Sequence, residues 1–295
     1  PELYLYPSRC RFLSNVMLQL SKPSMQLADP RTQIMYGTHS PFFIDLQRFD
    51  QIRLARKKAA DNTTTLQTKV TSFSRAEAAQ RLAQISLRTP DEFTNITFTA
   101  HAAPVMTTIV NEGFFADVAV VVEGLSEVAA LWTLQEIQSH NWDALGITIV
   151  PAGGKNNIDR PVVVFRGLDI PTYFIFDGDS RHRGTDKENK SITSNHLFLR
   201  LADVPTEDFP LTKVYDTWAV FNDELESELK LALGDVEFNR LRQTVADQLG
   251  YTQPSVVLKN PEGVSQFIRS IYSNGHRIPI LEDIVARITA LRRGR

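Results

Sequence analysis

Three short apolar runs between Asp117 and Asp179 limit most strongly what this chain can fold into. They are Val118–Val122, Ile147–Val150 and Tyr173–Phe176, and they are rich in β-branched and aromatic residues. Continuous apolar runs of this length are typical of strands buried on both faces of a parallel sheet. The segments between them have the spacing of crossover helices, so the sequence predicts an α/β fold with right-handed parallel connections.

Charged and glycine residues follow each of these runs directly. Glu123 follows the first run, Gly153-Gly154-Lys155 the second, and Asp177 and Asp179 the third. Ligands of open parallel sheets bind outside the carboxyl ends of the strands. The sequence therefore predicts an acidic site at one edge of a buried sheet, beside a turn whose glycines let backbone approach a phosphate closely.

Further acids extend this cluster. Glu127 falls in the first turn of the next expected helix, where the helix dipole favours an anion. A fourth apolar run, Thr217–Phe221, precedes Asp223, Glu224 and Glu226. Four or five carboxylates in one cleft repel each other, so some stay protonated unless a cation neutralises them. Oxygen ligands without His or Cys select Mg²⁺ or Mn²⁺, and two such ions about 4 Å apart can drive phosphodiester hydrolysis.

Composition sets the class of protein. The chain has 295 residues, 42% of them hydrophobic and 22% charged, which indicates an ordinary globular protein with room for two domains. No apolar run approaches the roughly 20 residues of a membrane helix, and no secretory signal precedes the first helix. The single Cys10 cannot form an intrachain disulfide, and His and Cys do not cluster as in a zinc site.

The charge balance argues against a generally basic nucleic-acid coat, because 34 acidic and 32 basic residues give a net charge of −2. Two local basic patches are either contacts to phosphate or solvated surface. They are Arg53, Arg56, Lys57 and Lys58, and Arg292, Arg293 and Arg295.

Periodicity and turn residues predict the remaining elements. An amphipathic helix is expected to end near Leu20, and further helices are expected over 74–87, 104–112 and 126–140. Ser74 and Glu77 can form a capping box at the start of the helix over 74–87. The region from 223 to 295 is expected to be mainly helical. Expected strands cover 33–36 and 51–58, a hairpin or loop covers 59–71, and 180–195 reads as a polar, mobile linker at the mouth of the site.

The start of the chain resembles the end of an ABC/SMC-type ATPase domain, on the residues Pro1–Pro7 (PELYLYP) and Thr38-His39-Ser40-Pro41. That resemblance implies that Glu2 lies just past a Walker B motif and that His39 senses the γ-phosphate of ATP. No phosphate-binding G-x-x-x-x-G-K-[ST] motif occurs in the sequence. We therefore expect a C-terminal fragment of a longer protein, without ATPase activity of its own.

Glu-Gly-Leu-Ser-Glu at 123–127 and Asp-Gly-Asp at 177–179 resemble the paired motifs of a Toprim domain. Together with Pro151–Ile158 (PAGGKNNI) and the ATPase-like start, they resemble the OLD (overcoming lysogenization defect) nuclease family. The fold so implied is a Toprim (Rossmann-like) parallel sheet flanked by helices. The implied parts are an ATPase remnant (1–71), a helical connector (72–115), the Toprim domain (116–222) and a helical C-terminal subdomain that completes the active site (223–295).

The same resemblance assigns roles to individual residues. The implied metal ligands are Glu123, Glu127, Asp177, Asp179 and a further acid, for which Glu226 is the first choice and Glu224 the second. Lys259 is the implied catalytic lysine, alongside Glu123, Asp177 and Asp179. The implied substrate-binding residues are Ser126, Gly153, Gly154 and Lys155, although Ser126 could instead cap the helix.

The implied activity is DNA endonuclease cleavage by two divalent cations, with ATP acting only through a part of the protein outside this chain. DNA is the expected partner, and a dimer is the expected state of the full-length protein. The cytoplasm is the expected location of a protein encoded by a bacterium or a phage. DNA repair or defence against phage is the expected role. Two alternatives stay open: another Toprim enzyme, resembling a topoisomerase or primase, and a catalytically idle DNA-binding tail of an ATPase.

Overall fold

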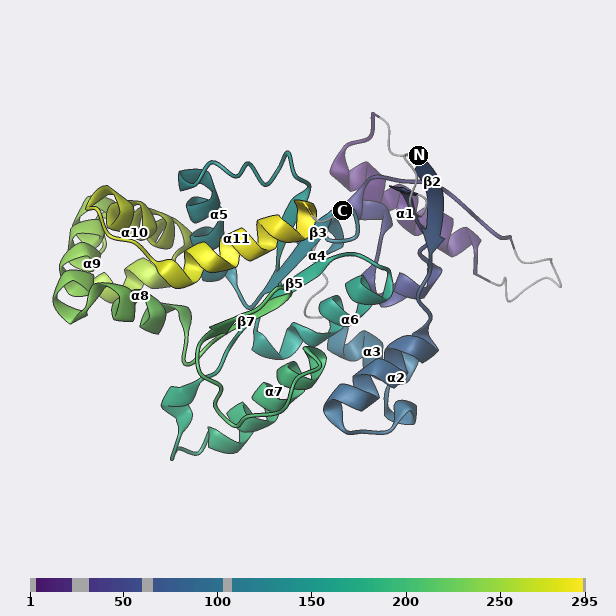
Figure 1. The fold of residues 1–295 in the computed structure, drawn as a ribbon. Coiled ribbons are helices and arrows are strands. Elements are labelled where there is room, and N and C mark those ends of the chain that lie inside the picture. Colours follow the sequence, from purple (N-terminus) through teal and green to yellow (C-terminus); the bar gives the residue numbers. More distant parts are fainter. Residues whose placement is uncertain (1–3, 23–31, 60–65, 103–107, 294–295) are drawn as a thin grey trace.

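A mostly parallel five-stranded sheet forms the centre of the molecule (Figure 1). The computed structural model describes residues 4–22, 32–59, 66–102 and 108–293. The strand order is β4-β3-β5-β7-β6, with β6 antiparallel to β7 and the other neighbours parallel. The strands are β3 (Val118–Val122), β4 (Ile147–Pro151), β5 (Thr172–Asp177), β6 (Lys213–Val214) and β7 (Trp218–Phe221).

The apolar runs form the central strands because both of their faces are covered. Every residue of β3 is buried, and the alternate residues belong to two different hydrophobic clusters. Val118 and Val120 pack into one cluster, and Ala119 and Val121 into the other. The predicted α/β fold is confirmed, including the parallel connections between the three runs.

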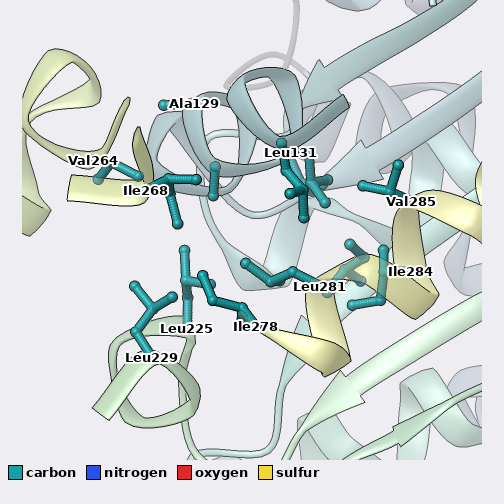
Figure 2. Packing of buried hydrophobic residues seen from close by; sticks show 14 of the residues in the cluster. Ala129, Leu131, Leu225, Leu229, Val264, Ile268, Ile278, Leu281, Ile284 and Val285 are labelled. Carbon is teal, nitrogen blue, oxygen red and sulfur yellow. The ribbon is translucent and has the colours of Figure 1, made fainter. Parts of the chain in front are cut away.

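C-terminal helices cover one face together with the first crossover helix. They are α5 (Leu125–Ile137), α8 (Leu225–Leu233), α9 (Asp235–Leu249), η7 (Pro254–Lys259), α10 (Pro261–Ser273) and α11 (Pro279–Arg293). Figure 2 shows Leu131 of α5 near Val285 of α11, and Ala129 near Val264 and Ile268 of α10. The C-terminal helices therefore share one core with the sheet.

Connector and later crossover helices cover the other face. They are α2 (Arg75–Ser86), α3 (Asn95–Ala102), α4 (Thr108–Glu112), α6 (Asp159–Gly167) and α7 (Glu188–Leu201). The short 3-10 turns η3 (Pro90–Glu92), η5 (Lys155–Asn157) and η6 (Ser180–His182) lie between them in the sequence and have no buried residue. Phe73 packs so tightly here that a Cβ at Gly167 would lie 2.5 Å from its ring. The capping box of Ser74 and Glu77, predicted from the sequence, is present.

The N-terminal elements lie at the opposite end of the molecule from α8–α10 (Figure 1). They are α1 (Pro7–Leu20), η1 (Pro41–Phe43), η2 (Leu46–Gln51) and an antiparallel hairpin of β1 (Leu54–Ala59) and β2 (Leu66–Thr71). Leu46 and Phe49 of η2 are fully buried in the cluster that covers the second face of the sheet. This contact fixes the N-terminal segment to the sheet.

Two elements predicted from the sequence are wrong. Residues 33–36 have no regular structure, because none of the strands in the described parts of the chain pairs with this short apolar run. The supposed mobile linker contains η6 and the start of α7, where Ser191 and Asn195 are buried on the helix face that also carries Phe198 and Leu199. The charged residues before 188 concealed the helical period of the residues that follow.

Across the described ranges, no helix is both long and apolar enough to cross a membrane.

Candidate functional site

The site lies at the carboxyl ends of β3, β4 and β5. Val122 at the end of β3 pairs with Pro151 at the end of β4. Beyond this pair, the Gly154 amide donates to the Glu123 carbonyl at 2.9 Å. Gly153 and Gly154 have φ values of +71° and +135°, which favour glycine strongly, so the turn brings its backbone directly beside the Glu123 segment.

The Asp-Gly-Asp loop is clamped against the end of β7. Gly178, Asp179 and Ser180 donate their amides to the carbonyls of Phe221, Asp223 and Asn222, at 2.7, 3.1 and 3.1 Å. A Cβ at Gly178 would lie 2.5 Å from the Asn222 carbonyl oxygen, so only glycine fits. This close approach holds the acids after β5 next to those after β7.

Three carboxyl groups form the interior of the site. Burial raises the pKa of Glu123, Glu127 and Asp177 above the ordinary values, most strongly for Asp177. The charges of Glu127, Glu123 and Asp179 raise the pKa of Asp177 further, and the Lys155 ammonium opposes them. Among the described residues, the Asp177 carboxyl makes no hydrogen bond or ion pair. Its negative charge is therefore poorly compensated by the protein itself.

Glu127 caps its own helix. Its Oε2 atom accepts a hydrogen bond from the Gly124 amide at 3.0 Å, and Gly124 is the N-cap residue of α5. The alternative in which Ser126 caps this helix is therefore wrong, because the helix begins one residue before Ser126. Glu127 lies in the first turn, as the sequence predicts.

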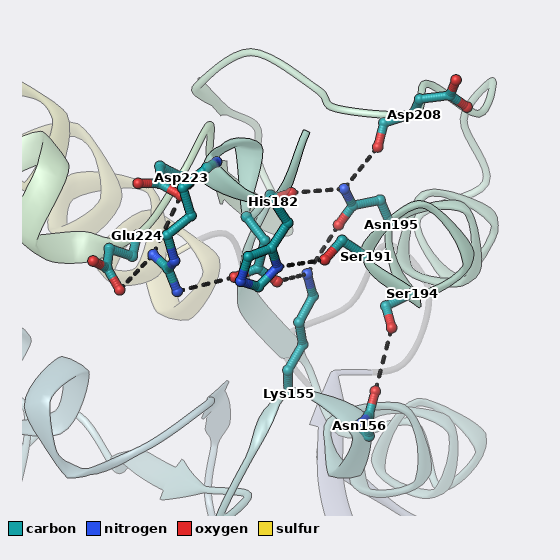
Figure 3. Close-up of polar contacts among 12 residues, drawn as sticks. Lys155, Asn156, His182, Ser191, Ser194, Asn195, Asp208, Asp223 and Glu224 are labelled. Atoms are coloured by element: carbon teal, nitrogen blue, oxygen red, sulfur yellow. Dashed lines mark hydrogen bonds and ion pairs between the residues drawn. The ribbon is translucent and has the colours of Figure 1, made fainter. Parts of the chain in front are cut away.

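Lys155 is held inside the site by two oxygen atoms (Figure 3). Its Nζ lies 2.7 Å from Asp179 Oδ2 and 3.0 Å from Asn195 Oδ1, and its side chain is only 11% exposed. Asn195 is fully buried and donates both amide hydrogens, to the carbonyls of Gly178 and Asp208, each at 2.8 Å. Asn195 thereby fixes the lysine and the Asp-Gly-Asp loop in one arrangement.

Arg181 forms a second, more exposed cation contact with the acids. Its guanidinium lies 3.2 Å from Asp179 Oδ1, 3.2 Å from Asp223 Oδ1 and 2.5 Å from Glu224 Oε2. Although burial opposes its charge, these carboxylates raise the pKa of Arg181. Burial raises the pKa of Glu224, and Arg181 counteracts part of that effect.

A hydrogen bond across the fold brings Lys259 beside the start of α5. The Ser126 hydroxyl donates to the Leu258 carbonyl at 3.1 Å. The bend that follows is rigid, because Asn260 caps α10 and a Cβ at Gly263 would lie 2.1 Å from the Val257 carbonyl oxygen. Lys259 itself is exposed at the end of η7. The two sequence candidates Ser126 and Lys259 thus belong to neighbouring segments.

Other predicted residues are distributed differently. Glu226 forms an ion pair with Arg242 of α9 at 3.1 Å, whereas Glu224 faces Arg181. His39 is exposed in the segment before η1, and none of the contacts above involves it. Glu2 lies outside the described residues.

The basic patches are partly neutralised. Arg56 and Arg292 lie 3.4 and 3.1 Å from the two oxygen atoms of Asp117, so residues from both patches pair with the same carboxylate. Arg56 also donates to the Ala116 carbonyl. Arg295 and the side chains of Lys58 and Arg293 lie outside the described parts of the chain.

Arg181 and Asn195 were not predicted as site residues from the sequence, and neither was the contact between Asp223 and Arg181. One signal for Asn195 is present, because Ser191, Asn195, Phe198 and Leu199 recur at the i, i+4, i+7, i+8 spacing of one helix face. A polar residue within such an apolar stripe is expected to have buried hydrogen-bond partners. No sequence signal distinguishes Arg181 from the neighbouring cations of 181–190.

The candidate metal ligands suit a hard divalent cation, because all of them are carboxylates and the Asp177 carboxylate has no partner among the described residues. The arrangement of the described side chains is not that of a closed metal cage: no group of three or more His, Cys, Asp or Glu among them is placed to hold an ion. Lys155 and Arg181 neutralise the acids instead.

The chain is similar to proteins of the OLD type. A family model described as "overcoming lysogenization defect protein-like, TOPRIM domain" matches residues 114–179. An OLD nuclease of Thermus scotoductus is 32% identical over 180 residues, which are 61% of this chain and 30% of that protein. The chain thus corresponds to less than a third of the length of this relative.

Solved structures of OLD C-terminal regions also align, with a TM-score of 0.40, and the functional assignment does not rest on them. The Xanthomonas campestris pv. campestris region is 17% identical and covers 62% of this chain and 96% of its own; the Burkholderia pseudomallei region is 16% identical and covers 60% and 99%. The segment that matches the OLD-like Toprim family model, 114–179, contains the acids at the ends of β3 and β5.

Proposed function

We propose that this chain is the nuclease region of an OLD-type protein and hydrolyses DNA phosphodiesters with divalent cations. The observation that carries the proposal is the partly buried Asp177 carboxyl, which lacks a partner among the described residues and lies within the field of Glu123 and Glu127. Burial and neighbouring carboxylates favour the uncharged form of such a group, whereas a bound cation favours its charged form. The OLD-like Toprim domain around it makes DNA the expected substrate.

The acids suggest two neighbouring cation positions. Glu123, Glu127 and Asp177 would hold one cation, and Asp179 with Glu224 the second. Glu224 is favoured over Glu226 because Glu224 shares Arg181 with Asp179, whereas Glu226 pairs with Arg242. Divalent cations bound there would polarise the scissile phosphodiester and make a bound water more acidic.

The chain's own cations have separate parts in this proposal. Lys155, fixed by Asn195, forms an ion pair with Asp179 and holds it in place. Lys259 is exposed next to the start of α5 and would neutralise charge that develops on the phosphate. The Gly153-Gly154 turn leaves backbone accessible to a phosphate oxygen.

The remaining predictions concern the longer protein. We propose that the chain divides into the parts 1–71, 72–115, 116–222 and 223–295, and that His39 senses ATP. We also propose a dimer, a cytoplasmic location, and a role in DNA repair or phage defence. These proposals follow from the OLD-type resemblance.

Nicking of supercoiled plasmid tests the proposed function. The chain is incubated with plasmid in Mg²⁺, Mn²⁺, Ca²⁺ or EDTA, alongside Asp177→Asn and the matched control Asp186→Asn, which alters an exposed acid in the same region. We expect nicking in Mg²⁺ or Mn²⁺, none in EDTA, and a loss of at least about a thousandfold in Asp177→Asn only.

Each alternative has a distinct outcome in this experiment. DNA binding without nicking in any metal would support the idle DNA-binding tail. Protein that stays covalently attached to the nicked strand would support a topoisomerase-like enzyme. Nicking that persists in EDTA or in Asp177→Asn would contradict metal-dependent cleavage at this site.

A further inference from the structure

Arg181 lies where its guanidinium contacts carboxylates from two different loops. Asp179 belongs to the loop after β5, and Asp223 and Glu224 belong to the loop after β7. The Arg181 amide also donates to Asp223 Oδ1 at 3.2 Å, so backbone and side chain use the same carboxylate. One positive group therefore occupies the space between acids that the proposed second cation would need.

Asp179 and Asp223 have partners besides Arg181 that hold them in position. Three backbone hydrogen bonds join 178–180 to 221–223, and Gly178, which has no side chain, lets the two loops lie in close contact. Asp223 is held in addition by the Ser227 hydroxyl, at 2.9 Å. Removal of the guanidinium would thus leave the Asp179 and Asp223 carboxylates in neighbouring, fixed loops.

The two cations of the site differ in their freedom to leave. Lys155 is 11% exposed and is tied to the buried Asn195. The side chain of Arg181 is 41% exposed, and its guanidinium contacts among the described residues are carboxylates only. An arginine side chain can rotate into solvent without disturbing packing when it is this exposed. Arg181 is therefore the displaceable cation.

We propose that Arg181 and a divalent cation compete for Asp179, Asp223 and Glu224, and that binding of the cation releases the guanidinium to bind a DNA phosphate at the mouth of the site. A guanidinium suits both positions, because it binds carboxylate and phosphate with the same paired N–H geometry. This inference rests on the proposed function, since it assumes that divalent cations bind the acids.

Calorimetric titration with Mn²⁺ tests the competition directly. The chain is compared with Arg181→Ala, Arg181→Lys and the control Arg183→Ala. The control removes the same charge two residues further along the chain, where the Arg183 guanidinium lies 4.8 Å from the centre of the Phe209 ring. We expect Mn²⁺ to bind roughly tenfold to a hundredfold more tightly to Arg181→Ala, and Arg183→Ala to change affinity less than about threefold. Arg181→Lys should be intermediate, because one ammonium cannot replace the fork of the guanidinium.

The outcomes separate this inference from the proposed function. Equal Mn²⁺ affinity in the original chain and in Arg181→Ala, or an equal gain in Arg183→Ala, would overturn the competition alone. No Mn²⁺ binding in any of the chains would contradict the cation site and, with it, the competition. Circular dichroism of Arg181→Ala checks the fold, and Arg181→Lys keeps the test decisive if the alanine variant unfolds.

Fluorescence anisotropy with a short DNA duplex tests the release. In Ca²⁺, Arg181→Gln should bind DNA several-fold more weakly than the original chain, and the slope of log affinity against log salt should fall by about one. In EDTA the two should bind equally, because the guanidinium is then held by the carboxylates. An equal loss in Ca²⁺ and EDTA would show that Arg181 reaches phosphate without displacement and would overturn the release.

Discussion

The acidic site has an inner half, Glu123, Glu127 and Asp177, and an outer half, Asp179, Asp223 and Glu224. The outer acids are paired with Lys155 or Arg181 at 2.5 to 3.2 Å. The inner acids form no ion pair among the described residues, and burial raises their pKa. The outer carboxylates are thus stabilised by ion pairs with Lys155 and Arg181, whereas the inner carboxyl groups have no such ion pair among the described residues.

This difference indicates where a cation from solution would gain most. On the inner half it would neutralise carboxyl groups that have no strong alternative. On the outer half it would have to replace Arg181. We therefore expect the inner position to bind a divalent cation more tightly than the outer position. Substitutions in the two halves, and at residues next to them, should therefore differ in their effects on the nicking rate and on stability.

The largest effect beyond the acids is expected from Lys259→Met. Removal of a cation that faces developing negative charge should lower the nicking rate about a hundredfold while Mn²⁺ affinity stays unchanged. Lys230→Met, which removes another exposed lysine, paired with Asp235, is the control and should leave the rate unchanged. A loss of Mn²⁺ affinity in Lys259→Met would assign the lysine to the metal site instead.

Asn195→Ala should uncouple Lys155 from the outer half. The substitution removes the side-chain donor to the Gly178 and Asp208 carbonyls and one of the two oxygen partners of Lys155, so the free energy of unfolding should fall by roughly 3 kcal/mol. Denaturant unfolding measures this loss, and Asn189→Ala, on the exposed side of the same helix, should cost less than about 0.5 kcal/mol. Equal losses would mean that Asn195 is not the residue that joins these loops.

The inner half should make the metal-free chain less stable as the pH rises. The folded-state pKa of Asp177 lies above its unfolded value, so its contribution to stability is complete below the unfolded pKa and is lost as pH rises through the folded pKa. In EDTA, Asp177→Asn should show a shallower fall in unfolding free energy over this range, and Asp186→Asn should keep the original profile. Parallel profiles for Asp177→Asn and the original chain would contradict an uncompensated Asp177.

The smallest effect is expected from Ser126→Ala. Loss of one hydrogen bond to the Leu258 carbonyl, worth about 1 kcal/mol, should lower the nicking rate about fivefold by loosening the Lys259 segment. In a Lys259→Met background the same substitution should have no further effect on the rate. An undiminished fivefold loss in that background would show that Ser126 acts independently of Lys259.

The sequence predicted the sheet well, because buried strands leave a strong local pattern. The runs at 118–122, 147–150 and 173–176 are β3, β4 and β5, and the acids after the first and third runs lie at the strand ends, as expected. The outer half was less predictable. Asn195 and Arg181 reach the site through tertiary contacts of α7 and η6, whose surroundings in the sequence suggest a solvated linker.

Charge patterns were similarly ambiguous. Arg56 and Arg292 are 236 positions apart (292 minus 56) and pair with the same aspartate, which no local reading of either basic patch could reveal. The choice between Glu224 and Glu226 also depends on the direction of α8, which points Glu226 toward Arg242 of α9.

Anomalous diffraction from crystals grown with Mn²⁺ tests most directly whether the acids at the ends of β3 and β5 hold divalent cations. We predict two peaks about 4 Å apart, one beside Glu123, Glu127 and Asp177 and the other beside Asp179 and Glu224, with Arg181 turned away from Asp179. A strong peak elsewhere and none beside Asp177 would contradict the account.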